Sequence, residues 1–145
     1  MPTLKLATLC EKVIVDANGV PSLISLFSQF NVSVPTGEAV PENAVAPKEW
    51  AMFCLWDCSP EEAGREFSQI FEITMPNGNL FGEPRTIRFT PQHDKLRQNV
   101  IANAPAVPIG RTGQITVTTR VEVDGRVVVA PISESFVVAY VQAAS

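Results

Sequence analysis

The sequence has few of the residues that usually carry catalysis or bind metals. It contains one histidine and three cysteines, and it has no G-x-S-x-G stretch and no glycine-rich phosphate loop. A nucleophilic serine or cysteine needs a base within reach, and a zinc ion needs several converging ligands. We therefore expect no catalytic residue, no metal ion and no cofactor.

Long apolar runs and clusters of basic residues are also missing. No window approaches the ~20 apolar residues of a membrane-spanning helix. Glu11 and Lys12 interrupt the amino-terminal segment before the apolar region of a signal peptide forms. The net charge is −4 and the 11 Lys and Arg residues are scattered, whereas nucleic-acid binding needs a concentrated positive field. These features predict a cytoplasmic protein that binds neither membranes nor nucleic acid.

The cysteines Cys10, Cys54 and Cys58 are odd in number, which favours reduced thiols over disulfides. Cys54 and Cys58 are four residues apart and would share one face of a strand, where Cys10 could join them. No histidine or fourth cysteine lies near them in the sequence. We therefore expect buried thiols that pack as small apolar side chains, and no zinc site.

The chain does contain a series of short strand patterns. In residues 114–123, QITVTTRVEV, the odd positions are apolar except Thr119 and the even positions are polar, which predicts a half-buried strand. Asp124-Gly125 predicts a tight turn, after which residues 126–129 return as the partner strand. Pro131 cannot donate to a ladder and marks an edge, a bulge or a strand end. Residues 133–141 are predicted as a final strand.

Further strands are predicted upstream. Residues 50–56, WAMFCLW, are apolar throughout, which suits a central strand covered on both faces, although periodicity alone does not exclude a helix. Shorter strands are predicted near residues 66–75, 86–90 and 100–102. Ser59-Pro60-Glu61-Glu62 predicts a single helical turn with a capping box, and residues 90–94 a similar turn. Residues 35–47 contain three prolines and are interpreted as a loop.

Residues 15–30 support two incompatible interpretations. Leu23, Ile24, Leu26, Phe27 and Phe30 recur at the spacing of an amphipathic helix, yet residues 16–19, DANG, form a typical hairpin turn. A helix here would interrupt a chain that is otherwise a succession of strands. We therefore predict a strand over residues 20–34, bent or bulged near residues 25–28.

Strands every dozen residues or so, with turns between them, are typical of a sandwich or a barrel. Two segments, LATLCEKVIVDANGVPSLISLFSQF and PAVPIGRTGQITVTTRVEVDGRVV, resemble an uncharacterised bacterial family of domains of unknown function. That family often has an aromatic residue where Ile115 stands here. The resemblance implies an immunoglobulin-like antiparallel β-sandwich. We expect one all-β domain over residues 1–145, with one or two single-turn helices in its loops.

The function expected from these features is a non-enzymatic protein-interaction module whose partner is another protein or itself. Exposed strand edges invite pairing with another chain, and Val127, Val128 and Val129 are the candidate interface. One alternative is a structural subunit of a larger phage or bacterial assembly.

Two further alternatives depend on particular side chains. Trp50 and Trp56 would bind a carbohydrate or protein ligand if they were exposed, with Phe53 on the opposite face, although core packing between two sheets is the favoured explanation. An enzyme would depend on Asp57, Glu61, Glu62 and His93. Capping of a helical turn accounts for the two glutamates without any catalysis.

Overall fold

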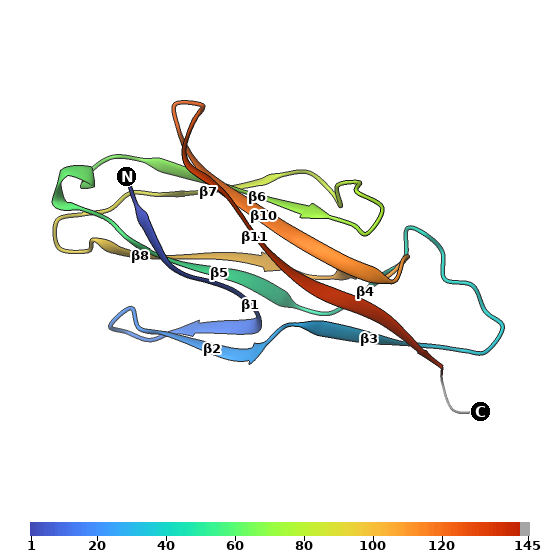
Figure 1. The fold of residues 1–145 in the computed structure, drawn as a ribbon. Helices are drawn as coiled ribbons and strands as arrows, with labels where there is room; N and C mark the ends of the chain where they lie inside the picture. The colour runs from blue at the N-terminus through green and yellow to red at the C-terminus, as the bar shows by residue number, and fades with distance from the viewer. Residues whose placement is uncertain (143–145) are drawn as a thin grey trace.

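Two β-sheets pack face to face around an apolar core in the computed structural model, which describes residues 1–142 (Figure 1). The strand order is β2-β1-β5-β8 in the first sheet and β3-β11-β10-β6-β7 in the second, and β4 pairs with β9. One 3₁₀ turn, η1, is the only helical element of the described residues. The predicted all-β fold class is confirmed. The elements are β1 (Thr3–Val15), β2 (Pro21–Leu26), β3 (Gln29–Val34), β4 (Val45–Ala46), β5 (Trp50–Asp57), η1 (Pro60–Glu62), β6 (Phe67–Thr74), β7 (Arg85–Phe89), β8 (Arg97–Ala104), β9 (Val107–Pro108), β10 (Gly113–Val123) and β11 (Arg126–Gln142).

Strand β1 doubles back on itself along its length (Figure 1). Its residues 3–10 pair with β5 and its residues 10–15 pair with β2. The turn between β1 and β2 is closed by the Asp16 carboxylate, which accepts hydrogen bonds from the backbone N–H groups of Asn18 and Val20. The predicted hairpin turn is therefore confirmed.

The hairpin of residues 11–26 lies over the outer face of the first sheet. The Asn99 side chain on β8 donates a hydrogen bond of 2.9 Å to the carbonyl oxygen of Gly19 in the hairpin turn. Because β5 separates β8 from β1 in the sheet, the turn reaches Asn99 only by crossing β5. Phe53, on the outer face of β5, is 1% exposed. Strand β5 is thus covered on both faces, as its apolar sequence predicts.

The segment of residues 20–34 is extended and passes from one sheet to the other. Its first part, β2, pairs with β1, and its second part, β3, pairs in parallel with β11. Between them Ser25 has a positive φ of 55° and Phe27 enters the core beside Phe136. The prediction of a strand bent near residues 25–28 is confirmed, and the apolar spacing that resembles a helix comes from this change of sheet.

Strands β10 and β11 form a long hairpin around the Asp124-Gly125 turn. Residues 133–141 are not a separate strand, because β11 runs without interruption from Arg126 to Gln142. Pro131 lies where the pairing with β10 shifts register, between the pairs Thr119–Ile132 and Val121–Val129. The bulge at this point absorbs a residue that cannot donate to the ladder.

The helical turn at residues 59–62 is confirmed as η1, with its capping box in place. The prediction of a similar helical turn at residues 90–94 is wrong. That segment is a loop in which Gln92 and Lys95 form an isolated antiparallel bridge, because a backbone hydrogen bond between them closes a tight turn instead. The loop of residues 35–47 ends in β4 and packs closely on Gly110, where any side chain would collide with the backbone of Glu42.

A chain of polar side chains crosses the core. Trp56 on β5 donates its indole N–H to the Gln69 amide oxygen at 2.9 Å, and the Gln69 amide nitrogen donates to the Thr119 hydroxyl at 2.9 Å. All three side chains are buried. Thr119, the one exception in the alternation of β10, is therefore a buried hydrogen-bond partner. The buried nitrogen and oxygen atoms of these three side chains all have hydrogen-bond partners, which buried polar groups require.

Candidate functional site

The two tryptophans of β5 are buried and point into the core. Trp56 has no exposed surface, and its indole is held by Gln69. Trp50 is 2% exposed, and its indole N–H donates to the carbonyl oxygen of Ala106 at 2.8 Å. Phe53 lies on the opposite face, as the alternation predicts, beneath the hairpin of residues 11–26. Neither tryptophan forms part of an exposed aromatic surface, but Trp50 borders a cavity.

That cavity lies between the sheets where their edge strands β7 and β8 stand apart, and its volume is about 350 Å³. Ala102, Ala104 and Ala106 contribute only methyl groups to its wall. Large side chains at these alternate positions would close the gap between the sheets, so the alanines leave it open. The remaining wall is mostly apolar and includes Trp50, Met52, Phe71, Ile73, Phe81 and Val117.

Three polar residues, Glu83, Arg85 and Asn103, line the cavity together with these apolar groups. Arg85 projects from β7 and donates a hydrogen bond from Nη1 to the carbonyl oxygen of Asn103 on β8. This bond joins the two edge strands of the sandwich beside the cavity. Among residues 1–142, Arg85 forms no ion pair, whereas Arg88, Arg97, Arg111 and Arg120 each contact a carboxylate.

The outward side of the hairpin of residues 11–26 carries a second candidate site. Ile14, Ile24 and Leu26 are 46%, 41% and 72% exposed, and Lys12 is paired with Ile24 across the two strands. The alternate residues Val13 and Leu23 are half-buried against the first sheet. We call Lys12, Ile14 and Ile24, together with Leu26 at the rim where β2 ends beside Leu9, the hairpin face. A two-stranded hairpin with an apolar outer surface is a typical place for another chain to bind.

The third candidate is the edge of β11. Strand β3 pairs only with residues 137–142 of β11, so residues 126–136 have a ladder partner on the β10 side alone within the described chain. Val127 is 54% exposed, and Val128 and Val129 are half-buried against the core cluster. Pro131 and the register shift interrupt this edge, and both features hinder the addition of a further strand.

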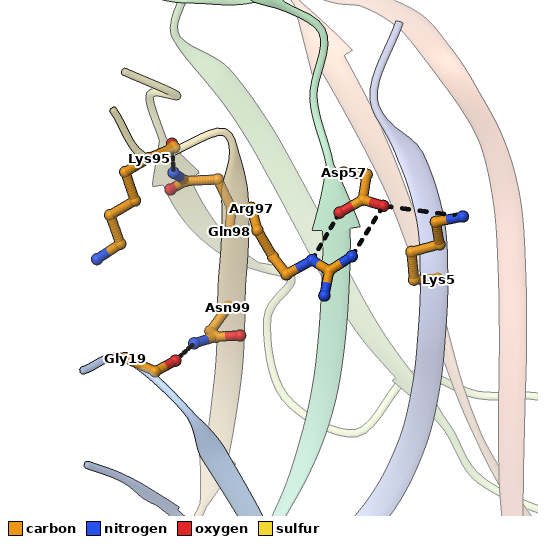
Figure 2. A network of polar contacts seen from close by, with 7 residues as sticks. All are labelled: Lys5, Gly19, Asp57, Lys95, Arg97, Gln98 and Asn99. Atoms are coloured by element: carbon orange, nitrogen blue, oxygen red, sulfur yellow. Dashed lines mark hydrogen bonds and ion pairs between the residues drawn. The ribbon is translucent and has the colours of Figure 1, made fainter. Parts of the chain in front are cut away.

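Ionic side chains cross the outer face of the first sheet beyond the hairpin (Figure 2). Arg97 on β8 contacts both carboxylate oxygens of Asp57 on β5, at 2.8 and 3.2 Å, and Lys5 on β1 lies 3.7 Å from the same carboxylate. The hydrogen bond from Arg97 holds the pKa of Asp57 below its usual value. These contacts tie three strands together and give Asp57 a structural role.

The four residues of the enzyme alternative do not share one site. Asp57 is held by Arg97 and Lys5, and Glu62 accepts hydrogen bonds from the backbone N–H and hydroxyl of Ser59, at 2.7 and 3.0 Å. Glu61 and His93 are exposed. Within residues 1–142 no hydrogen bond or ion pair joins any two of these four. Burial raises the pKa of Glu62, but the hydrogen bonds from Ser59 and the amino group of Met1, 3.2 Å from Oε2, together lower it.

The three cysteines are free and buried, as the sequence predicts. Burial raises the pKa of Cys54 and of Cys58 to about 11, and Glu62 adds to the shift at Cys58. In the part of the chain that the structure describes, no three histidine, cysteine or acidic side chains converge as metal ligands. The same residues include no helix with the length and apolarity needed to cross a bilayer.

Sequence reasoning missed two of these features. Arg85 lies in a strand whose sequence is typical of an exposed edge strand, and only the structure places this arginine beside a cavity. The residues of the hairpin face belong to an amphipathic pattern, and the sequence does not indicate which side of that pattern is covered by the sheet. One signal was available for the cavity, because the alternating alanines of residues 102–106 are unusually small for an edge strand over a core.

Comparison with known proteins finds no family model, no curated protein and no solved structure that matches the chain. No relative therefore suggests an activity, a ligand or a partner. The surfaces and the cavity described above carry the functional evidence.

Proposed function

We propose that this chain is a non-enzymatic protein-interaction module that binds another protein through the hairpin face. The observation that carries the proposal is the exposure of Ile14, Ile24 and Leu26 on a hairpin whose other side is already packed on the sheet. Burial of large apolar side chains is the main favourable term in protein association. Several large apolar side chains exposed on one hairpin favour a binding site there.

The charge of the hairpin face indicates the chemistry of the partner. Lys12 is exposed between the apolar residues and forms no ion pair within the described chain. A partner that presents apolar side chains beside a carboxylate complements this surface. A two-fold contact between two copies centred on this face would bring Lys12 against Lys12, and like charges in close contact are unfavourable. A different protein therefore fits better than a second copy.

The backbone of β2 indicates that a partner contacts its side chains and does not pair with it as an added strand. Pro21 has no N–H to donate at one end of β2, and Ser25 has a positive φ near the other. An added strand needs a regular row of N–H and C=O groups. We infer that the partner packs on the face of the hairpin and does not extend the sheet.

Topology supports an immunoglobulin-like sandwich as the scaffold of this module. One sheet has the order β3-β11-β10-β6-β7, β3 is parallel to the last strand, and the chain changes sheets between β2 and β3. A sandwich in which one segment changes sheets and then pairs in parallel with the last described strand resembles the variable-type immunoglobulin arrangement. We also propose that the chain is related to the uncharacterised bacterial family that its sequence resembles. Three free buried thiols favour a reducing compartment, in this proposal the cytoplasm.

A photo-crosslinking experiment tests the proposal. The photoreactive residue p-benzoylphenylalanine replaces Leu26 in the full chain, and the protein is illuminated in lysate of its native cell. We expect one specific partner to be cross-linked, and we expect the product to disappear when Ile24→Lys is added to the same chain. The matched control carries the photoreactive residue at Leu80, an exposed apolar residue after the turn that follows β6 in the second sheet. Equal labelling from both positions, or labelling that survives Ile24→Lys, contradicts the proposal.

The free edge of β11 favours a second candidate, a structural subunit of a larger assembly. Val127 is exposed beside backbone groups of β11 that lack a second ladder partner in the described chain. If the chain assembles with itself through this edge, light scattering with reductant present gives a mass above that of the monomer, and Val127→Lys restores the monomer. A monomer at all concentrations removes this candidate and leaves the interaction module.

A further inference from the structure

We propose that the cavity between β7 and β8 binds a small amphipathic acid, with its apolar body between the sheets and its carboxylate on Arg85. This site is separate from the hairpin face, which lies on the outer surface of the hairpin of residues 11–26. It concerns a small ligand, whereas the proposed function concerns a protein partner. Either can be correct without the other.

The size and the walls of the cavity indicate the body of the ligand. Its volume of about 350 Å³ lies in the range of small-molecule sites, which are roughly 300–1,000 Å³. The deep wall consists of Trp50, Met52, Phe71 and Val117, none of them more than 5% exposed. Such a wall offers no hydrogen-bond partner to a buried polar group of a ligand, so the inserted part must be aliphatic or aromatic.

The wall is also held in shape before any ligand binds. The indole N–H of Trp50 is already satisfied by the carbonyl oxygen of Ala106, which fixes the ring against the cavity. The guanidinium of Arg85 is positioned beside the cavity by its hydrogen bond to the carbonyl oxygen of Asn103. A preformed site avoids much of the cost of ordering side chains during binding.

The polar residues indicate the head group. A guanidinium carries five N–H donors in a planar fork, and the structure gives Arg85 a single hydrogen bond, to Asn103. Among residues 1–142 no carboxylate forms an ion pair with Arg85, so donors remain for a carboxylate of the ligand, which suits a guanidinium in a two-point contact. Glu83 also lines the cavity, and its charge opposes a second anionic group. We therefore infer a monocarboxylate.

Calorimetric titration of the full chain with octanoate and with octan-1-ol tests the site. Both probes have the same chain length, and only octanoate carries a carboxylate. We expect saturable binding of octanoate that weakens about tenfold or more in Arg85→Gln, and weaker binding of octan-1-ol that this substitution leaves unchanged. Arg126→Gln, another exposed arginine without a carboxylate partner in the described chain, is the matched control and leaves both affinities unchanged.

A second variant tests the location inside the sandwich. Ala104→Leu adds volume where the edge strand borders the cavity and removes binding of both probes, while Ala130→Leu on β11 does not. Circular dichroism and thermal unfolding show whether each variant is folded. The absence of saturable octanoate binding to the wild-type chain overturns the proposal. If a folded Arg85→Gln variant loses the same amount of affinity for octanoate and for octan-1-ol, the proposed contact between Arg85 and the carboxylate is overturned.

Discussion

The indole nitrogen of Trp56 lies 2.9 Å from the amide oxygen of Gln69, in a core where neither side chain is exposed to solvent. Trp56 belongs to one sheet and Gln69 to the other, so this hydrogen bond fixes how the two sheets face each other. Gln69 also donates to Thr119 on the neighbouring strand β10. A slip of either sheet would leave these polar groups buried without partners.

We predict that Gln69→Leu destabilises the fold by about 2–4 kcal/mol, because each buried polar group left without a partner costs about 1–3 kcal/mol. The groups affected are the indole N–H of Trp56 and the hydroxyl of Thr119. Urea unfolding measures the loss. Gln98→Leu, which removes an exposed hydrogen bond to Lys95, is the control and changes stability by less than about 0.5 kcal/mol. Equal stability of the two variants would show that the core bonds contribute nothing.

We predict that the stabilising effect of Glu62 depends on pH. Burial raises the pKa of this carboxyl, but hydrogen bonds from Ser59 and the nearby amino group of Met1 bring its folded-state pKa below the ordinary 4.5. A lowered folded-state pKa gives stability that is present above the unfolded-state value and is lost as the pH falls through the folded-state value. Wild type should therefore exceed Glu62→Gln in stability, by about 1 kcal/mol at neutral pH. The two should converge in acid when unfolding is followed across pH, and a constant difference would contradict this.

We predict that Ser25→Val destabilises the chain by about 1–2 kcal/mol, because a β-branched side chain is strained at the positive φ of 55° that Ser25 adopts. Ser22→Val is the matched control in the same strand, where the backbone is extended and the side chain is exposed. It should be neutral or slightly stabilising, since valine favours strands. Thermal unfolding compares the two variants. A similar effect of both would mean that residue 25 does not need its left-handed conformation.

We predict that the three thiols react slowly in the native state. Burial raises the pKa of Cys54 and Cys58 to about 11, so that only about one thiol in a thousand is ionised at pH 8, and the thiolate is the reactive form. Titration with a disulfide reagent should label few thiols before unfolding and all three in denaturant. Ser28→Cys introduces an exposed thiol and should react at once. Rapid labelling of the wild-type chain would contradict the burial of its cysteines.

Individual strands and turns were predictable because the alternation of apolar and polar side chains indicates which face of a strand is buried. The β10–β11 hairpin, the apolar strand β5 and the capped turn at Ser59 all follow from patterns shorter than a dozen residues. Thr119 shows where such patterns fail. Its polar side chain breaks the alternation, and its role depends on Gln69, which is 50 residues away in the sequence.

Long-range geometry was not predictable for a related reason. A strand such as β1 has the same alternating pattern whether it continues flat or doubles back after Cys10. Consequently the sequence alone does not indicate that the hairpin of residues 11–26 covers β5 or that Ile24 and Leu26 face outward. The position of Arg85 beside a cavity likewise depends on the spacing of two edge strands, which no local pattern encodes.

The parallel pairing of β3 with β11 joins residues 29–34 to residues 137–142, near the two ends of the described chain. During synthesis on the ribosome, β3 emerges well before β11, its neighbour in the sheet. The second sheet therefore cannot be completed until more than a hundred further residues have been translated, and until then β3 lacks its only ladder partner in the described chain. Such distant pairing also slows folding in free solution. Until β11 emerges, the unpaired backbone groups of β3 are open to pairing with other chains.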